Sequence, residues 1–379
     1  IYKNIYQLPP AHFAIFRKGR IDIKRYWKLS YKPIDVSYED AKKEVHRLLI
    51  SAVSKRLLSS DVEVGTFLSG GVDSSLVTLI VAKIKKDPLK VFSVSYKNHD
   101  ELAFALEVSD KVKSDLFKIN IDFPSVSELE NVLEYFDEPH ADTSDFPQHL
   151  ISQLASEKLK VVLSGDGADE LFLGYKWHLN KDRVDIFDRR LNEICAFDKR
   201  GRIKLWGSDK NISDDLLDTE IYDGLFSEIE KLEMFDITSH LPGQILTKVD
   251  RASMMHGLEV RSPFLDTELV EYVFNLPYEY KINADGQKRI LRDILTEYMP
   301  KEFAYRRKQG FGSPIWLWLN QEGMKDFVYL KLGNCAFIRD FFEGNEIDKC
   351  ITDFYDKYVG HQRAGQRIWV LLCLELWTE

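Results

Sequence analysis

A short polar loop between two apolar segments carries the residue types that bind phosphate. Residues 69–75 read Ser-Gly-Gly-Val-Asp-Ser-Ser, between an expected strand that ends at Leu68 and an expected helix that begins near Ser74. Two adjacent glycines let the backbone approach an anion closely, and the N–H groups that start a helix point toward it. A plain strand-to-helix turn would need only the glycines. The whole string predicts a phosphate site, and it is neither a Walker A loop nor a GxGxxG fingerprint.

A second strand-to-loop segment is rich in acids. The apolar residues 161–163 run into a loop with three carboxylates in five positions, at Asp166, Asp169 and Glu170. Crowded carboxylates repel one another unless a cation or a substrate neutralises them. A Mg²⁺ ion bound mostly by phosphate oxygens and by one or two carboxylates meets that need. We expect Asp73 and Asp169 to be the two metal ligands, whereas a solvated acidic turn is the simpler alternative.

Two further segments mix basic, acidic and apolar residues. Residues 305–312 read Tyr-Arg-Arg-Lys-Gln-Gly-Phe-Gly, a basic cluster that indicates either a lid over an anion or a solvated loop. Residues 248–251 (Lys-Val-Asp-Arg) and 259–266 (Glu-Val-Arg-Ser-Pro-Phe-Leu-Asp) interleave charged and apolar side chains. These two stretches are expected to form either a buried ion network or one wall of a substrate pocket.

Alternating strands and helices must bring these loops together. The hydrophobic pattern predicts a helix over 37–58, and then strands and helices in turn over 62–68, 74–85, 90–96, 101–113, 116–121 and 126–136, a helix over 146–157 and a strand over 160–163. Such alternation indicates βαβ units, in which right-handed crossovers place ligands at the carboxyl ends of the strands. The expected fold class is α/β, with a doubly wound, Rossmann-like, mostly parallel sheet followed by a mainly helical C-terminal region.

Outside this core the strand signals are weak. After about residue 176, helices are expected over 225–235, 267–274, 287–298, 323–331, 346–358 and 366–377. Residues 196–220 are polar and are expected to form an exposed excursion. Residues 1–30 predict short extended pieces that turn at Lys18-Gly19 and lean on another part of the protein.

Composition narrows the function classes. The 379 residues carry 52 Lys and Arg against 61 Asp and Glu, a net charge of −9, which disfavours a nucleic-acid partner. Hydrophobic residues at 44% suffice for a core, and no apolar run is long enough to span a membrane, so no membrane partner is expected. The four cysteines lack CxxC spacing and the nine histidines lack HxxxH spacing. This pattern favours a reducing, cytoplasmic location.

Five motifs in order resemble the synthetase domain of glutamine-dependent asparagine synthetases, within the PP-loop ATP pyrophosphatase superfamily. The match runs from about residue 31 to 319 and rests on SGGVDSS at 69–75, DEPHADTSDFP at 137–147, VVLSGDGADELFLGY at 161–175, LTKVDRASMMHGLEVRSPFLD at 246–266, and KRILRDILTEYMP with RRKQGFGSP between 288 and 314. The resemblance implies that ATP and Mg²⁺ adenylate the side chain of L-aspartate. Pyrophosphate then leaves, and ammonia attacks the β-aspartyl-AMP to give asparagine and AMP.

The resemblance also assigns roles to single residues of this sequence. It implies pyrophosphate contacts at Ser69, Gly70, Gly71, Asp73 and Ser74, magnesium ligands at Asp73 and Asp169, and adenine and ribose contacts at Phe67, Val94, Ser164 and Gly165. Asp166 stands where the family often has Glu, an acid tied to adenylate formation and amidation. Lys308 would stabilise the transition state in which pyrophosphate departs.

The front of the chain departs from the family pattern. The family begins with an amidotransferase domain whose nucleophile is an N-terminal cysteine, whereas this sequence begins with Ile1 and has its first cysteine at Cys195. Residues 1–30 resemble the closing strands of that domain, so ammonia is expected to come from a glutaminase domain absent from this chain. Residues 31–175 are then the ATP-binding core and 176–379 the helical part of the synthetase domain, and homo-oligomerisation stays open.

Three other functions compete with asparagine synthesis. A related PP-loop amide ligase would act on another carboxylate, as in sugar-acid amidation or in a cyclase that closes a lactam. A PP-loop enzyme that modifies tRNA is disfavoured by the acidic charge and by the lack of a basic, aromatic-rich stretch. A binding or scaffold protein without catalysis is disfavoured because Asp73, Asp169 and Lys308 are all present.

Overall fold

A parallel five-stranded sheet forms the centre of the protein. The computed structural model describes residues 3–85, 87–96, 101–122, 124–180, 195–208, 227–306, 315–333, 336–356 and 361–378. The strand order is β5-β4-β3-β6-β7, and every neighbouring pair is parallel. The strands are β3 (Val64–Phe67), β4 (Lys90–Tyr96), β5 (Asp115–Ile121), β6 (Val161–Leu163) and β7 (Glu259–Arg261).

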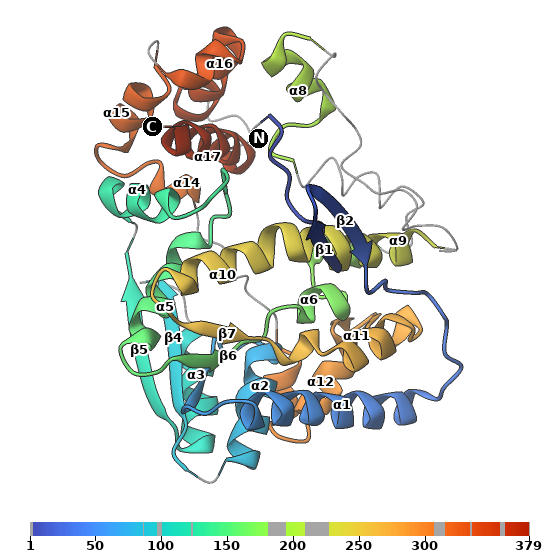
Figure 1. Ribbon diagram of the computed structural model, residues 1–379. Helices are drawn as coiled ribbons and strands as arrows, with labels where there is room; N and C mark the ends of the chain where they lie inside the picture. Colours follow the sequence, from blue (N-terminus) through green and yellow to red (C-terminus); the bar gives the residue numbers. More distant parts are fainter. Residues whose placement is uncertain are drawn as a thin grey trace.

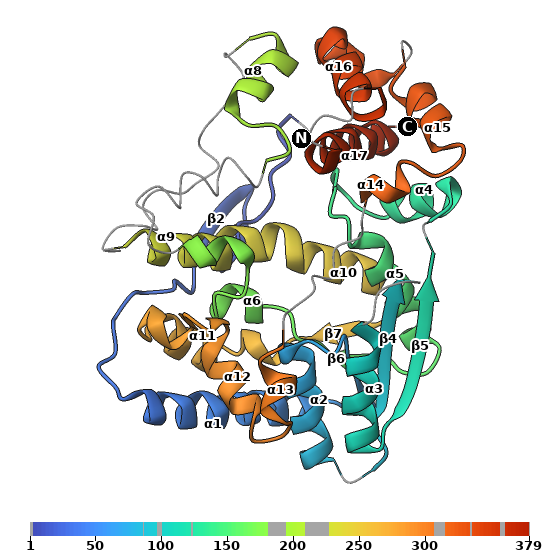
Figure 2. The ribbon, with the colours of Figure 1, turned by 180° about the vertical axis from the view of Figure 1, so that it is seen from behind.

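Helices cover both faces of the sheet, which confirms the doubly wound α/β prediction. Successive strand residues point to opposite faces, so Val161 and Leu163 of β6 join one core while Val162 joins another. The first core also takes in α1 (Tyr38–Leu58), α2 (Val72–Ile84), α3 (Glu101–Val112), α11 (Thr267–Phe274) and α12 (Arg289–Leu295). The second core contains α5 (Asp145–Ser156), which contacts α10 (Thr247–Met254). Figures 1 and 2 show α1 and α10 on opposite sides of β6 and β7.

The C-terminal region has a helical core of its own. It contains α14 (Ile315–Trp318), α15 (Met324–Lys331), α16 (Gly344–Tyr355) and α17 (His361–Thr378), with α4 (Val126–Glu134) from the α/β part packed against them (Figure 1). Trp318 and Trp369 meet edge to face in this core, with ring centroids 5.4 Å apart. The indole N–H of Trp369 donates to the carbonyl of Ala141 at 3.1 Å. This bond ties α17 to the loop that precedes α5.

The N-terminal hairpin forms as expected but leaves its apolar side chains exposed. Strands β1 (His12–Arg17) and β2 (Arg20–Arg25) pair antiparallel. Lys18 and Gly19 both have positive φ, which is the backbone of a tight two-residue hairpin turn. The side chains of Phe16, Ile21 and Ile23 are between 52 and 71% exposed. The described part of this chain does not cover these side chains, and the expectation that the hairpin leans on something else stays a prediction.

Several elements differ from the sequence expectations. Strand β7 lies well beyond residue 176, where no further strand was expected. A π-helix, η3 (Asp236–Leu246), joins α9 (Glu228–Phe235) to α10, and the sequence pattern indicated neither η3 nor α10. Helix α8 (Lys199–Trp206) buries Leu205 against the C-terminal core, so this part of 196–220 is not an exposed excursion, and residues 209–220 lie outside the described residues.

The remaining elements are short. They are α6 (Ala168–Leu171), η1 (Lys176–Asn180), η4 (Pro263–Leu265), η5 (Tyr278–Tyr280), β8 (Ile282–Asn283), β9 (Gly286–Gln287), α13 (Lys301–Ala304) and η6 (Phe337–Asp340). The division of the chain into domains at residues 30 and 175 stays a proposal. Strand β7, which belongs to the central sheet, lies beyond the second of these boundaries. Within the described residues, no helix has both the length and the apolarity needed to cross a bilayer.

One fully buried ion pair fastens α9 to the segment between α11 and β8. The Lys281 ammonium donates to Glu233 at 2.6 Å and to the carbonyl of Phe274 at 3.3 Å, and both charged side chains are at most 2% exposed. Burial raises the pKa of Glu233 to about 7 even though Lys281 opposes that shift. Removing the lysine alone would leave a buried carboxyl group without its cation.

We therefore expect Lys281→Met to lower the free energy of unfolding by about 3–5 kcal/mol at pH 7. The double variant Glu233→Met/Lys281→Met should be much milder, because no uncompensated charge remains. Since the folded-state pKa of Glu233 is raised, the penalty in Lys281→Met should grow as pH rises above about 4.3, the pKa of an unfolded glutamate. Urea unfolding at several pH values measures this, and equal losses in both variants would contradict it.

Candidate active site

The carboxyl ends of β3 and β6 lie side by side and place the two predicted loops together. Thr66 of β3 pairs with Leu163 of β6 in the parallel register. The phosphate loop begins two residues after β3 ends at Phe67, and the acidic loop follows β6 directly. Parallel strands end at the same edge of a sheet, so both loops open at one edge, as the sequence predicts.

Hydroxyl groups close the phosphate loop on itself. The backbone N–H of Ser69 donates to Ser74 Oγ at 3.2 Å, and the N–H of Gly71 donates to Ser69 Oγ at 3.3 Å. Gly70 has a φ of +78°, which is unfavourable for other residues. Helix α2 starts immediately afterwards at Val72. The loop therefore presents the start of a 13-residue helix to an incoming anion.

The two loops touch at a glycine. A Cβ atom on Gly165 would lie 3.0 Å from the Asp73 Cβ and 3.0 Å from the Ser74 backbone nitrogen. Only glycine lets the acidic loop approach the phosphate loop this closely. The structure thus brings together Ser69, Asp73, Ser74, Ser164 and Gly165.

The proposed nucleotide-base contacts lie at the same edge. Phe67 ends β3, and Val94 lies on β4, next to β3 in the sheet. Both side chains are nearly buried and belong to the core on the α5 side of the sheet. Their assignment to adenine and ribose stays a prediction.

A lysine that the sequence did not single out joins the two expected metal ligands. Lys288 Nζ lies 2.5 Å from Asp73 Oδ2 and 2.7 Å from Asp169 Oδ1. Its side chain is 3% exposed, and its backbone has a φ of +56° just before α12. A left-handed conformation at a residue other than glycine costs about 1–2 kcal/mol. The fold therefore accepts local strain to place this ammonium between two carboxylates.

The carboxylate pair fits a magnesium ion held mainly by a nucleotide. Asp73 and Asp169 supply hard oxygen atoms, and together with Lys288 they leave one net negative charge. Asp73 Oδ1 is buried and has no hydrogen-bond partner among the described residues. Among the residues that the structure describes, no three or more His, Cys, Asp or Glu side chains form a group that could bind a metal ion by themselves. This donor set suits Mg²⁺, which keeps most of its ligands from phosphate and water.

Asp166 lies between opposing electrostatic influences. Burial raises the pKa of its carboxyl group, and the nearby carboxylates of Asp169 and Asp73 raise it further. The Ser164 hydroxyl and the Lys248 ammonium lower the pKa, but the net shift is upward. The hydroxyl of Ser262 donates to the Asp166 carbonyl and holds the loop in place. Asp166 is therefore a stronger base than an ordinary aspartate.

The two stretches 248–251 and 259–266, which interleave charged and apolar residues, lie in different surroundings. Lys248 is buried and faces Asp142, so this residue belongs to a buried ion network. Asp266 instead pairs with Arg56 at 3.0 Å and with Lys55 at 3.2 Å between α1 and the segment before α11. The second half of the segment thus fastens α1 and does not join Lys248.

The basic segment is described only at its start. Arg306 donates to the carbonyl of Gly70 in the phosphate loop. Its guanidinium lies 3.9 Å from the ring centre of Phe104 and 4.1 Å from that of Phe303. Lys308, the expected catalytic cation, lies outside the described residues, so its role stays a prediction.

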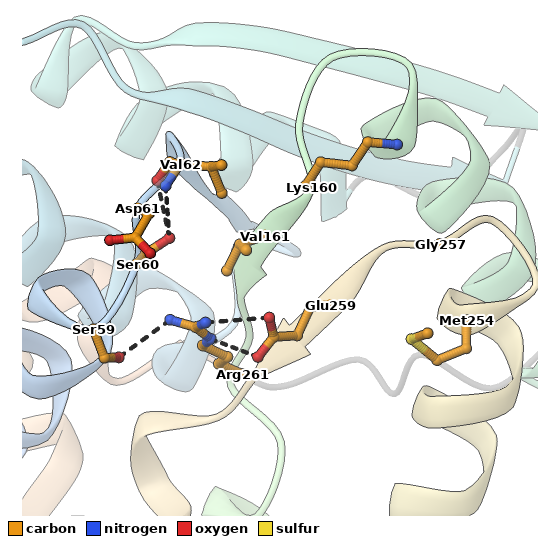
Figure 3. Close-up of a pocket in the computed structure, with 10 residues that line it drawn as sticks. All are labelled: Ser59, Ser60, Asp61, Val62, Lys160, Val161, Met254, Gly257, Glu259 and Arg261. Atoms are coloured by element: carbon orange, nitrogen blue, oxygen red, sulfur yellow. Dashed lines mark hydrogen bonds and ion pairs between the residues drawn. The ribbon is translucent and has the colours of Figure 1, made fainter.

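A cavity of about 390 Å³ lies at the opposite edge of the sheet (Figure 3). Its lining includes Val161 and Glu259, the first residues of β6 and β7, and Figure 3 shows Arg261 forked onto Glu259, at 2.8 and 3.1 Å. Because the phosphate and acidic loops leave the carboxyl ends of β3 and β6, at the other edge of the sheet, this cavity is not the candidate active site.

Comparisons with known proteins identify the family of this chain. The family model "Asparagine synthase" matches residues 44–379. Asparagine synthetase [glutamine-hydrolyzing] 1 of Bacillus subtilis is 27% identical over 97% of this chain and 64% of its own length. Asparagine synthetase [glutamine-hydrolyzing] 3 of the same organism is 30% identical over 82% of this chain and 55% of its own. The chain thus spans less than two thirds of the length of these relatives.

A solved structure of an NMN synthetase from Francisella tularensis overlaps 58% of this chain and 94% of its own at 14% identity, with a TM-score of 0.26. At that score the likeness carries no argument beyond the topology described above. The family match extends over nearly the whole described fold and includes the phosphate loop, the acidic loop, Lys248 and Lys288. This chain belongs to the asparagine synthase family.

Proposed function

We propose that this chain carries out the synthetase half of asparagine formation. ATP adenylates the side chain of L-aspartate with release of pyrophosphate, and ammonia then displaces AMP from β-aspartyl-AMP to give L-asparagine. The ammonia comes from glutamine through a glutaminase domain, in line with the names of the Bacillus subtilis relatives, which are glutamine-hydrolyzing asparagine synthetases. The observation that carries the proposal is the convergence of Asp73 and Asp169 beside the phosphate loop.

The residues of the site divide the first step between them. The Ser69–Ser74 loop and the start of α2 hold the β- and γ-phosphates, while Phe67, Val94, Ser164 and Gly165 bound the adenosine. Asp73 and Asp169 would hold Mg²⁺, which supplies positive charge to the phosphates when bound. A side-chain carboxylate oxygen of aspartate then bonds to the α-phosphorus, the bond to pyrophosphate breaks, and Lys308 stabilises the departing charge.

Asp166 serves the second step. The nitrogen of ammonia bonds to the acyl carbon, the bond from that carbon to the AMP oxygen breaks, and one proton must leave the nitrogen. A carboxylate with a raised pKa accepts that proton more readily than an ordinary aspartate. Exchange of pyrophosphate into ATP with L-aspartate, beside a panel of sugar acids and lactam precursors, separates this proposal from the related amide ligases. Exchange that depends on a sugar acid and not on L-aspartate would refute it.

We expect Asp73→Asn and Asp169→Asn each to lower pyrophosphate release by roughly 10²- to 10³-fold or more at ordinary magnesium concentration. Each substitution removes one anionic ligand but keeps the size of the side chain, so the fold should survive. Asp250→Asn, an exposed acid on α10, is the matched control and should behave as the unmodified protein. Near-normal release by either site variant would remove that residue from the metal site.

Gly174→Ala tests whether the spacing of the carboxylate pair matters. A Cβ at residue 174 would overlap both Lys288 Cε and Asp169 Oδ1, so the ion pair must shift. Gly243→Ala is the control, because a Cβ there meets nothing within 4 Å. We expect pyrophosphate exchange to fall at least tenfold in Gly174→Ala alone. Unchanged exchange in Gly174→Ala would show that the observed geometry is not required.

The base role of Asp166 predicts a pH dependence. The folded-state pKa of this carboxyl is raised, so the amidation rate should fall as pH drops through a value above the ordinary 3.8 of an aspartate. The rate is measured at constant free ammonia with preformed β-aspartyl-AMP. Asp166→Asn should be slow and should lose this acidic limb, whereas Asp166→Glu should restore it. An acidic limb that persists in Asp166→Asn belongs to another group.

A further inference from the structure

Two partly exposed histidines from different elements meet at the end of α10. His149 lies within α5, and His256 follows the last residue of α10 by two positions. Nε2 of His256 lies 3.1 Å from Nδ1 of His149, and the two ring centres are 4.7 Å apart. Figure 1 shows α10 ending beside α5. The two residues are 107 positions apart, so no spacing in the sequence indicates the pair.

The two rings meet at a bend. In a straight N–H···N hydrogen bond each ring centre lies behind its nitrogen on the line of the bond, so the centres would be farther apart than the 4.7 Å observed. Two imidazole nitrogens that bind one zinc ion, each at about 2.0–2.1 Å, are about 3.3 Å apart at a tetrahedral angle. The observed separation of 3.1 Å is close to that value. A small adjustment therefore lets both nitrogens bind the same ion.

Both rings are in the protonation state that binds metals. Burial and the neighbouring His256 lower the pKa of His149 to about 4, although Glu128 opposes the shift. Burial also lowers the pKa of His256. A neutral imidazole has one ring nitrogen without a proton. The ring that donates in the hydrogen bond needs only to move its proton to its outer nitrogen, so an ion can bind without net release of a proton.

The electrostatic surroundings favour a positive ion at the pair. His256 lies just beyond the C-terminal end of α10, where the helix dipole is negative. α9, η3 and α10 follow one another directly along the chain. The carboxylate of Glu128, on α4, also acts on His149 through its charge. A cation between the two rings thus gains from the helix end and from one carboxylate.

Regular structure holds both side chains in place. The backbone N–H groups of Gly257 and Leu258 bond back to the last turn of α10, at 3.0 and 3.1 Å, and Gly257 has the positive φ of a left-handed helix end. This turn fixes the backbone of His256. On α5, the ring of Phe146 stacks against that of His149 with centroids 6.3 Å apart. Ligands held on rigid elements keep the geometry that a metal ion requires.

We infer that His149 and His256 bind one divalent transition-metal ion, such as Zn²⁺, between α5 and α10. Imidazole nitrogens suit Zn²⁺, whereas Mg²⁺ prefers oxygen ligands. Water fills the remaining positions, since no third His, Cys, Asp or Glu among the described residues forms one group with the pair. The ion fastens α10 to α5 at the end of α10 opposite Lys248, which bonds to Ser144 just before α5. Neither the ion nor this fastening depends on the proposed function.

Calorimetric titration of the chain with Zn²⁺ tests the site. The proteins are the unmodified chain, His149→Gln, His256→Gln and the control His12→Gln. His12, on β1, is a partly exposed histidine that lies far from the pair in the sequence. Excess Mg²⁺ is present throughout, because it competes with Zn²⁺ for Asp73 and Asp169 but not for imidazoles.

We expect the unmodified chain and His12→Gln to bind one equivalent of Zn²⁺ through the pair. Each of the other two variants should lose more affinity than the about 10- to 100-fold that removal of an outer-shell partner typically costs, because each lacks a ligand. Zn²⁺ at about 100 times its Kd should raise Tm of the unmodified chain by about 2–5 °C. The same addition should leave Tm of His149→Gln and His256→Gln unchanged.

Three results would overturn the inference. Absence of Zn²⁺ binding by the unmodified chain would leave the pair as a hydrogen bond alone. Unchanged binding in both glutamine variants would place the ion elsewhere, and loss in only one of them would reduce the site to a single histidine. Thermal unfolding in metal-free buffer confirms that the variants are folded. ¹⁵N spectra of the unmodified chain need no variant, since Zn²⁺ must shift the ring nitrogens of His149 and His256 together.

Discussion

The architecture of the active-site edge depends on one electrostatic constraint, the repulsion between two carboxylates that the sheet forces together. Asp73 follows β3 and Asp169 follows β6. Because these strands pair in parallel, both side chains lie at the same edge of the sheet and close to each other. Lys288 offsets part of the repulsion by bonding to both. Lys288 adopts a left-handed backbone conformation to place its ammonium there. Glycine is needed at residues 165 and 174, because a Cβ atom at either position would collide with the ion pair or with the phosphate loop.

A second lysine extends the same principle along the edge. Lys248 pairs with Asp142, and its positive charge also lowers the pKa of Asp166. The carboxylates of Asp73 and Asp169 raise that same pKa. The acids thus alternate with two cations that come from far along the chain, one from α10 and one from the start of α12. Both helices follow strands β3 to β6 in the sequence, so the candidate active site is complete only with the later part of the chain.

Residue patterns predicted the parts of this site that are local in the sequence. The phosphate loop, the acidic loop and the alternating strands and helices each have a periodic or compositional signal within a few residues. Strand β7 has only three residues, Glu-Val-Arg, and two of them are charged, so the strand has no hydrophobic pattern that could predict it. The π-helix η3 contains Pro242 and Gly243, which indicate a break in a helix and not its continuation. Lys288 was missed because a lysine near the start of a helix is ordinarily exposed, and only the tertiary fold buries it.

The bond between Lys288 and Asp73 joins residues 215 positions apart, and this separation affects how the protein must be made. During synthesis the chain emerges from its N-terminus at about 5–20 residues per second. Asp73 and Asp169, at the starts of α2 and α6, are therefore available on the order of ten seconds before Lys288 is. In that interval Asp73 and Asp169 lack the lysine that bonds to both of them, so their mutual repulsion is not yet offset by Lys288. The order of translation thus delays the contacts of Lys288 with Asp73 and Asp169 until residue 288 has been made.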